Sequence, residues 1–276
     1  MPPDVNRPVV PVVLVTGAAR RIGRAIALEL ARHGWRVAVH YRGSAAEAAQ
    51  TVALIAQAGG TAQAFAADLA DEAQCEALLP AVQAAFGRVD AVVNNASLFG
   101  WDDVAGFRTA AMEAHWRANT APAIILARAL HAGLAARPAD ADAGAARGCV
   151  VNLLDQKLFN PNPDYLSYTL SKAALQAATA MLAQALAPAV RVCAVAPGVT
   201  LLSGAMSDAE FDAAHRMTPL QRGSTPQDVA GAVRFLLESP AITGSTLLVD
   251  GGQHLQPQAR DVMFLARQAG PPPKDV

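Results

Sequence analysis

The chain has 276 residues, of which 53% are hydrophobic and 16% are charged, and its formal net charge is -1. This composition supplies enough apolar surface for one large core and excludes disorder over the bulk of the chain. The near-neutral charge and the scattered basic residues do not suggest a basic face, so we expect no nucleic-acid partner and no anionic membrane partner. The three cysteines, Cys75, Cys149 and Cys193, are far apart and odd in number, which indicates a reducing, intracellular compartment.

The sequence carries no signal for export, membrane insertion or metal binding. The proline-rich residues 1–11 lack the apolar run of a signal peptide, and no later stretch has the length of a membrane span. There is no C-x-x-C, and the six histidines show no H-E-x-x-H or H-x-x-x-H spacing. We therefore expect a cytoplasmic protein that binds no metal ion and has a flexible segment over residues 1–11.

Short apolar runs alternate with longer helical patterns in the first part of the chain. Residues 12–15 are apolar at every position, which predicts a strand buried on both faces, as in a parallel sheet. Ile22, Ile26 and Leu30 recur every four residues and predict a helix that ends near Gly34. The same reasoning predicts further strands at 36–41, up to about 67 and at 91–93, with helices at 45–58 and 72–86.

The alternation continues in the second part of the chain. A long helix is expected at 110–136, followed by a polar loop at 138–148. Strands are then predicted at 149–154, 190–195 and 246–249, and helices at 165–186 and 226–237. Because repeated strand–helix units connect through right-handed crossovers, we expect a doubly wound parallel α/β sheet of about seven strands, covered by helices on both faces.

No linker divides the chain, so we expect one domain over residues 12–255 and a C-terminal extension over residues 256–276. A short helix is expected near residues 259–266, and the proline-rich last residues are expected to be disordered. The partly apolar stretch 200–219 is expected to form a lid over a pocket at the ends of the strands.

The first predicted strand runs into the sequence T-G-A-A-R-R-I-G at residues 16–23, which opens the first predicted helix. Glycine lets the backbone come close to a pyrophosphate, and the start of a helix supplies partial positive charge. We interpret Gly17, Gly23 and the residues between them as a dinucleotide-binding turn. An ordinary tight turn, which uses the same residue types, is the alternative.

The end of the second predicted strand distinguishes between the two nicotinamide dinucleotides. A site for NAD usually has an acidic residue there to bind the ribose, whereas this chain has His40, Tyr41, Arg42, Gly43 and Ser44. Arginine and serine suit the 2′-phosphate of NADP, which a carboxylate would repel. We therefore expect NADPH as the cofactor and Arg42 and Ser44 as phosphate ligands. The alternative is that Arg42 is a solvated loop residue.

Tyr168 and Lys172 are four residues apart in a predicted helix, so both side chains lie on one face. Reduction of a carbonyl or an imine needs a proton as well as a hydride, and a free tyrosine relays protons poorly at neutral pH. A nearby ammonium lowers the pKa of a tyrosine because it stabilises the phenolate. Pairs with this spacing are also common surface contacts, so the pair gains meaning only from its context.

In this order, the motifs resemble those of the short-chain dehydrogenase/reductase family. The family pattern T-G-x-x-x-G-x-G corresponds to residues 16–23 and Y-x-x-x-K to residues 168–172. The motif N-N-A-G corresponds to residues 94–97, with Ser97 in place of the glycine, a departure that points to one branch of the family. The resemblance implies a Rossmann-type fold, a homotetramer, and a catalytic role for Asn119 beside Tyr168 and Lys172, in which it keeps a water chain to the lysine. The implied cofactor-binding residues are Gly17, Arg20, Arg21, Ile22, Gly23, His40, Tyr41, Arg42, Ser44, Asp68, Leu69, Asn95, Ala96, Ser97, Tyr168, Lys172, Pro197 and Gly198.

Several departures from the common pattern resemble the pteridine reductase branch of that family. Arg21 replaces the middle glycine of the first turn, and Asp155, 13 residues before Tyr168, replaces the usual serine. Phe99 and Tyr165 also match that branch, in which the aromatic side chain at the first position stacks on the pterin. The implied substrate-binding residues are Arg21, Ser97, Phe99, Asp155, Tyr165 and Tyr168.

Asp155 is the residue on which the functional prediction mainly depends. An ionised carboxylate beside Tyr168 would raise the pKa of the tyrosine and oppose ketone reduction, whereas an acid that relays a proton suits a ring nitrogen. We therefore expect NADPH-dependent hydride transfer to a C=N bond of a dihydropterin or dihydromonapterin, with dihydrofolate as a further candidate. Asp155 as a capping residue and Phe99 as core or lid filling are the simpler alternatives.

Two other functions remain open from the sequence. The first is an NADPH-dependent carbonyl reductase for a 3-oxoacyl thioester or another ketone, which would tolerate serine in place of Asp155. The second is an NADPH-binding sensor or scaffold without turnover. Such a protein has no need of Asn119, Tyr168 and Lys172 together, so their presence favours an enzyme.

Overall fold

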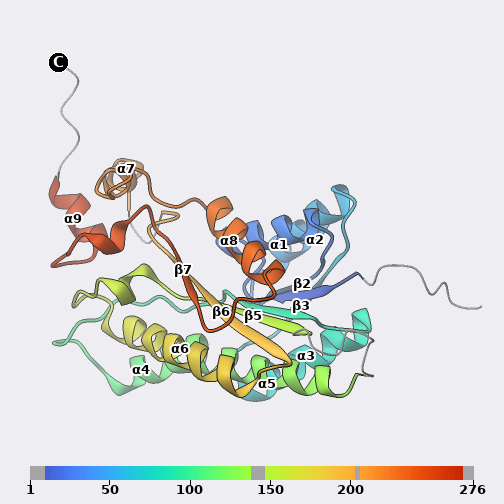
Figure 1. The fold of residues 1–276 in the computed structure, drawn as a ribbon. Coiled ribbons are helices and arrows are strands. Elements are labelled where there is room, and N and C mark those ends of the chain that lie inside the picture. The colour runs from blue at the N-terminus through green and yellow to red at the C-terminus, as the bar shows by residue number, and fades with distance from the viewer. Residues whose placement is uncertain (1–9, 138–146, 203–205, 270–276) are drawn as a thin grey trace, which may run out of the picture.

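The computed structural model describes residues 10–137, 147–202 and 206–269. Seven parallel strands form one sheet in the order β3-β2-β1-β4-β5-β6-β7, with helices on both faces (Figure 1). This arrangement confirms the expected doubly wound α/β sheet. The strands are β1 (Val12–Val15), β2 (Arg36–Tyr41), β3 (Ala62–Ala66), β4 (Ala91–Asn94), β5 (Gly148–Leu153), β6 (Val190–Pro197) and β7 (Thr246–Val249).

Helices α1, α2 and α8 cover one face of the sheet, and α3, α5 and α6 cover the other (Figure 1). Helices α7 and α9 contact each other at one end of the molecule. The α-helices are α1 (Arg21–Arg32), α2 (Ala45–Gln57), α3 (Glu72–Phe86), α4 (Thr109–His115), α5 (Ala121–Ala135), α6 (Leu166–Ala185), α7 (Asp208–Arg216), α8 (Pro226–Glu238) and α9 (Val262–Ala269).

Strand β1 lies at the centre of the core, and all four of its side chains are fully buried. Val13 and Val15 pack into the cluster formed with α1 and α8, whereas Val12 and Leu14 pack into the cluster formed with α3 and α5. Burial of each such side chain contributes about 1.5–3 kcal/mol. The unbroken apolar run of β1 therefore follows from its position between two helical layers.

The single helix expected at 110–136 is divided by a π-helical turn at Trp116–Thr120, which joins α4 to α5. Pro122, in the first turn of α5, has no N–H and cannot donate the regular helical hydrogen bond. The wider π turn accommodates this missing bond and is typical of functional sites. It also holds Asn119, which is buried and donates a hydrogen bond to Ser171 of α6.

Helix α7 lies within the expected lid, and hydrophobic periodicity does not predict it. Its first turn is held by a capping box, in which Glu210 N donates to Ser207 Oγ and Ser207 N donates to Glu210 Oε2. The S-x-x-E sequence of residues 207–210 is the signal that identifies this helix start. The short helix expected near residues 259–266 is present as α9.

Three expectations concern stretches that lie mostly or wholly outside the described residues. These are the flexibility of residues 1–11, the polar loop at 138–148 and the disorder of residues 270–276. Among the residues that the structure does describe, no helix is both long enough and apolar enough to cross a bilayer.

Candidate active site

The strand order reverses between β1 and β4, which creates a crevice at the carboxyl ends of the strands. A cavity of about 620 Å³ lies there, within the usual size range of small-molecule sites. The predicted residues that line it are Gly17, Arg20, Arg21, Ile22, Gly23, His40, Tyr41, Arg42, Ser44, Asp68, Leu69, Asn95, Ala96, Ser97, Phe99, Asp155, Tyr168 and Gly198.

Four predicted residues lie outside the lining of this cavity. Lys172 and Pro197 line an adjoining cavity of about 160 Å³, whose walls also include Asp155 and Tyr168. Asn119 and Tyr165 are buried, and neither belongs to the described lining of the two cavities. The structure therefore places these two residues behind the cavity surface.

The turn after β1 depends on two glycines. Gly17 has φ +63, in the left-handed region, and a Cβ on Gly23 would lie 2.2 Å from the Gly17 carbonyl oxygen. Helix α1 can therefore start directly against the turn. Arg20, which precedes α1, makes no side-chain capping hydrogen bond, so the first N–H groups of the helix remain available to an anion.

Arg21 occupies the position of the usual middle glycine and keeps a glycine-like backbone conformation, with φ 55. Its guanidinium Nη2 donates a hydrogen bond of 2.9 Å to the carbonyl oxygen of Leu202. Leu202 lies at the start of the expected lid, so this bond joins the glycine turn to the lid. Arg21 and Leu201, the neighbour of Leu202, both line the cavity.

The His40 side chain connects the glycine turn to the end of β3. Its Nδ1 accepts a hydrogen bond of 3.0 Å from Gly17 N, so its Nε2 carries the proton and donates to the carbonyl oxygen of Ala67 at 3.1 Å. Burial lowers the pKa of His40, which keeps the ring neutral. His40 therefore fixes the turn through both ring nitrogens as well as lining the cavity.

The Asn95–Ala96 segment also lies against the glycine turn. Thr16 Oγ1 accepts hydrogen bonds from Asn95 N at 2.8 Å and from Ala96 N at 3.0 Å. Asn95 Nδ2 donates to the carbonyl oxygen of Thr16 at 2.9 Å. These contacts hold the end of β4 to the end of β1, which fixes the floor of the cavity.

Asp155 and Tyr168 form the reactive pair of the cavity. Asp155 follows β5, Tyr168 lies in the first turn of α6, and the Tyr168 hydroxyl donates to Asp155 Oδ2 at 2.8 Å. Burial raises the pKa of Asp155, and the hydrogen bonds from Lys157 N and Tyr168 reduce that rise. A carboxyl group with a raised pKa can hold a proton closer to neutral pH, which suits a relay.

Lys172 lies on the same face of α6 as Tyr168, as predicted, but the two side chains make no direct hydrogen bond. Its Nζ donates to the Leu153 carbonyl oxygen at 2.6 Å and lies 5.8 Å from the centre of the Tyr168 ring. Burial raises the pKa of Tyr168 well above its usual value, and the charge of Asp155 adds to that rise. The expected low pKa of Tyr168 is therefore wrong, because burial and Asp155 raise it overall.

Asn119 holds the loop after β4 against α6. Its Oδ1 accepts from Leu98 N at 2.6 Å and from Ser97 Oγ at 3.2 Å. Its Nδ2 donates to the Leu98 carbonyl oxygen and to Ser171 Oγ, both at 3.0 Å. The amide already makes four hydrogen bonds within the protein, so these contacts make Asn119 a positioning residue. Its implied water chain to Lys172 stays a prediction.

Phe99 packs against two tyrosines, of which Tyr168 lines the cavity and Tyr165 does not. Its ring stacks on Tyr165, with centroids 4.3 Å apart and planes at 16°, and meets the edge of Tyr168 at 4.7 Å. Phe99 is 45% exposed, so part of its ring remains free for a flat ligand. Tyr165 supports Phe99 from behind.

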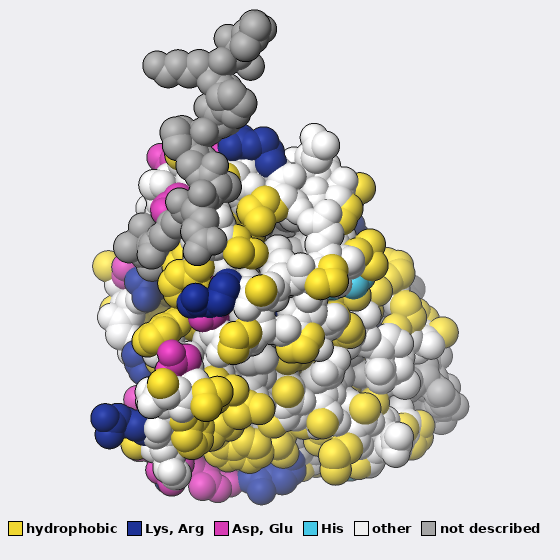
Figure 2. Space-filling model, turned by 90° about the vertical axis from the view of Figure 1, so that its left-hand side faces the viewer, with side chains coloured by type: hydrophobic (Ala, Val, Ile, Leu, Met, Phe, Trp, Pro, Cys, Tyr) yellow, Lys and Arg dark blue, Asp and Glu magenta, His cyan; other side chains and the backbone are white. Residues whose placement is uncertain are grey.

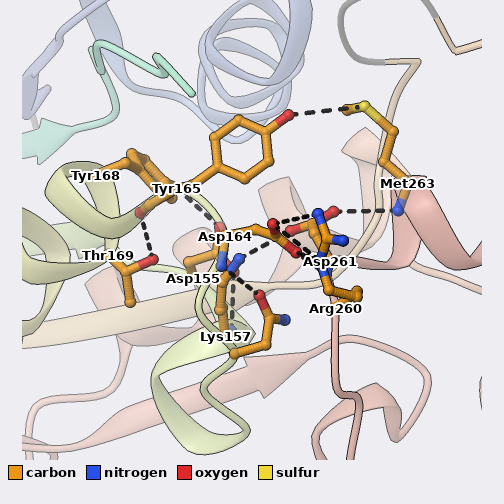
Figure 3. A network of polar contacts seen from close by, with 10 residues as sticks. Asp155, Lys157, Asp164, Tyr165, Tyr168, Thr169, Arg260, Asp261 and Met263 are labelled. Atoms are coloured by element: carbon orange, nitrogen blue, oxygen red, sulfur yellow. Dashed lines mark hydrogen bonds and ion pairs between the residues drawn. The ribbon is translucent and has the colours of Figure 1, made fainter. Parts of the chain in front are cut away.

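The sequence motifs do not identify the C-terminal part of the cavity wall. Lys157, Gln258, Asp261, Val262 and Met263 all line the cavity, and most of them take part in the polar network shown in Figure 3. These residues come from two segments about 100 positions apart, and no spacing rule connects them. On the surface at the α7–α9 end, acidic, basic and hydrophobic side chains are mixed (Figure 2).

Comparison with known proteins agrees with this geometry. A family model described as enoyl-(acyl carrier protein) reductase matches residues 17–254. The crystal structure of FolM alternative dihydrofolate reductase 1 from Brucella canis, complexed with NADP, has a TM-score of 0.83 and 39% identity. That match covers 91% of this chain and 96% of the other.

Curated relatives include reductases of two kinds. Pteridine reductase 1 of Leishmania tarentolae is 32% identical, over 90% of this chain and 98% of its own. A 3-oxoacyl-(acyl-carrier-protein) reductase of Staphylococcus aureus is also 32% identical, over 88% of this chain and 97% of its own. The chain therefore belongs to the short-chain dehydrogenase/reductase family and resembles its pteridine reductase branch.

Proposed function

We propose that the protein is an NADPH-dependent reductase that transfers a hydride to the C=N bond of a dihydropterin. The hydrogen bond between Tyr168 and Asp155 carries this proposal, because it pairs a phenol with a carboxyl group whose pKa burial raises. A neighbouring acid suits protonation of a ring nitrogen better than polarisation of a ketone. The half-exposed ring of Phe99 on the same cavity supports a flat, aromatic substrate.

The turn after β1 fits the cofactor. The close approach of Gly17 and Gly23 leaves no room for side chains, and the start of α1 has no side-chain cap, as pyrophosphate binding requires. Arg42 and Ser44, on the rim of the cavity after β2, would hold the 2′-phosphate. When bound there, NADPH supplies the hydride.

The side chains of the protein handle the proton. The Tyr168 hydroxyl would donate a proton to the ring nitrogen, and a protonated Asp155 would replace it through their shared hydrogen bond. Lys172 would stabilise the negative charge that develops on this pair, since its Nζ lies 5.8 Å from the Tyr168 ring centre. Asn119 and Ser171 keep the start of α6 in place.

The charge of Lys172 predicts a pH dependence. Burial lowers the pKa of Lys172 to about 8, so the side chain is an ammonium below this pH and neutral above it. We therefore expect kcat/KM for dihydropterin reduction to fall as the pH rises through about 8. The measurement is a pH profile of kcat/KM, which reports the groups of the free enzyme. A profile that stays flat across this pH would contradict the role of Lys172.

Arg42 provides a prediction for cofactor choice. Arg42→Ala is expected to weaken NADPH binding by about 10- to 100-fold, the worth of a hydrogen bond to a charged group, and to leave NADH binding nearly unchanged. Titration of each cofactor by fluorescence measures both constants. Arg32→Ala, an exposed arginine in the last turn of α1, is the matched control. Equal losses for both cofactors in Arg42→Ala would refute a 2′-phosphate contact.

The test of the proposed function is NADPH oxidation by the purified protein with dihydrobiopterin, dihydromonapterin or dihydrofolate, each compared with an acetoacetyl thioester. Turnover with a pterin supports the proposal. Turnover with the thioester alone would make the protein a carbonyl reductase, like its 3-oxoacyl relatives. Tight NADPH binding without any turnover would favour a sensor. The homotetramer implied by the family stays a prediction, which light scattering tests.

A further inference from the structure

The C-terminal segment, residues 256–266, is a wall of the active site. It follows the region matched by the family model, which ends at residue 254. Arg260 binds the carboxylate of Asp164 with two nitrogens, through Nε to Oδ2 at 2.8 Å and Nη2 to Oδ1 at 2.8 Å (Figure 3). Asp261 N also donates to Asp164 Oδ2, at 2.7 Å. These bonds clamp the segment to the loop that precedes Tyr168.

The clamp sets the position of the Asp261 carboxylate. Asp261 Oδ2 accepts from Lys157 Nζ at 3.0 Å, and Oδ1 accepts from Met263 N at 3.1 Å (Figure 3). Each oxygen thus has one described donor, although a carboxylate oxygen can accept more than one hydrogen bond. The Asp261 side chain is 18% exposed and lines the cavity, so it remains accessible to a ligand.

Lys157 connects Asp261 to the reactive pair. Its backbone N donates to Asp155 Oδ1 at 2.9 Å, while its buried Nζ binds Asp261. Lys157 thus links the two carboxyl groups, and the negative charge of Asp261 adds to the rise in the pKa of Asp155 that burial causes. Asp261 therefore belongs to the reactive end of the cavity rather than to the cofactor end.

Gln156, between Asp155 and Lys157, provides a second observation. It lines the cavity and is only 7% exposed, and its Oε1 has no hydrogen-bond partner among the described residues. A buried acceptor without a donor is costly, and it points to a ligand that brings one. The cavity wall next to Asp155 thus offers acceptors to a substrate with additional hydroxyl or amine groups.

The chemistry of dihydropterins defines which part of the substrate reaches this wall. Reduction of the bond between nitrogen 5 and carbon 6 adds the hydride to carbon 6 and the proton to nitrogen 5. Carbon 6 carries the substituent that distinguishes one pterin from another. Since nitrogen 5 must meet Tyr168, the substituent begins beside the Tyr168–Asp155 pair, where Asp261 lies.

We propose that Asp261 recognises the substrate by accepting a hydrogen bond from a hydroxyl group of the carbon 6 substituent. This inference rests on the proposed function and adds to it the residue that distinguishes one carbon 6 substituent from another. Lys157, Asp164 and Arg260 are positioning residues, which hold the Asp261 carboxylate against the cavity.

The test compares two substrates that differ in the hydroxyl groups alone. These are a 7,8-dihydropterin with a polyhydroxypropyl substituent and 6-methyl-7,8-dihydropterin. Asp261→Asn is expected to raise KM for the hydroxylated substrate by about 10-fold or more, because a hydrogen bond to a charged group is lost. The lost charge also acts on the pKa of Asp155, so any change in kcat is expected to be the same for both substrates. KM for the methyl substrate is expected to stay close to that of the wild type.

Two further variants keep the test decisive. Asp212→Asn, an exposed aspartate of α7 outside the described cavity lining, makes the same charge change and is expected to behave as wild type. Arg260→Ala removes the clamp at a half-exposed side chain and is expected to give the same substrate-selective rise in KM. The melting temperature and the NADPH affinity of each variant report whether it is folded.

Each remaining outcome overturns the inference. Equal rises in KM for both substrates would mean that Asp261 does not distinguish the two substituents, and unchanged KM values for both would mean that it makes no contact. If the wild type reduces neither dihydropterin, the proposed function fails, and the inference fails with it. If the wild type reduces both and the selectivity of Asp261→Asn is unchanged, only the inference fails.

Discussion

Tyr168→Phe is expected to lower kcat for dihydropterin reduction by about 10²- to 10⁴-fold, the usual contribution of a general acid. The variant loses the hydroxyl that donates to Asp155 at 2.8 Å. It keeps the ring, whose edge contacts Phe99 with centroids 4.7 Å apart, so the shape of the cavity is preserved. The loss is therefore expected in kcat rather than in substrate binding.

Steady-state kinetics with a dihydropterin measures this effect, and titration with NADPH shows whether the cofactor site is intact. We expect the affinity for NADPH to stay within about twofold of the wild type, since the glycine turn and Arg42 are unchanged. Wild-type turnover in Tyr168→Phe would show that another group supplies the proton. It would also remove the main support for the proposed reaction.

The sequence predicts the fold well because the strands are buried on both faces. In β1 every residue is fully buried, so its apolar run has no break and is easy to recognise. The turn at residues 16–23 is equally clear, because Gly17 and Gly23 meet at a contact that no side chain tolerates. Local rules therefore identify both the sheet and the place where it reverses.

The sequence predicts the site less completely, because several contacts depend on exact placement. Four-residue spacing places Tyr168 and Lys172 on one face of the helix. It does not show that Lys172 donates its hydrogen bond to the Leu153 carbonyl oxygen rather than to the Tyr168 hydroxyl. The break in the helix before α5 follows from Pro122, a signal that the apolar pattern around it conceals. The sequence identifies Asn119 as a candidate, but its four hydrogen bonds, with Ser97, Leu98 and Ser171, come from the tertiary structure.

The sequence predicts helix α9 in the C-terminal wall, but not the contacts that make this segment part of the site. The bonds between Asp164 and Arg260 join residues 96 positions apart, and the pair formed by Lys157 and Asp261 spans 104 positions. Charged pairs of this kind follow no periodicity, and isolated charges are usually solvated at the surface. Their meaning appears only once the loop before α6 and the segment before α9 lie side by side (Figure 3).

Asp155→Ser is the substitution that separates the two reductase functions. We expect kcat/KM for a dihydropterin to fall by about 10²-fold or more, because the variant loses the carboxyl group that relays the proton. The serine hydroxyl can polarise a ketone, but it does not ionise near neutral pH and so cannot supply the proton that a carboxylic acid supplies. Activity with an acetoacetyl thioester, measured in parallel by NADPH oxidation, is therefore expected to be retained or to increase.

Asp155→Asn separates the acid from the shape of the side chain. Asparagine can still accept the hydrogen bond from Lys157 N, which now goes to Asp155 Oδ1, so the loop before α6 is expected to keep its position. It cannot hold the proton that the raised pKa of Asp155 favours, so pterin reduction is expected to fall as far as in Asp155→Ser. If Asp155→Asn instead retained full pterin turnover, Asp155 would serve to hold the loop, and Tyr168 would have to take its proton directly from solvent.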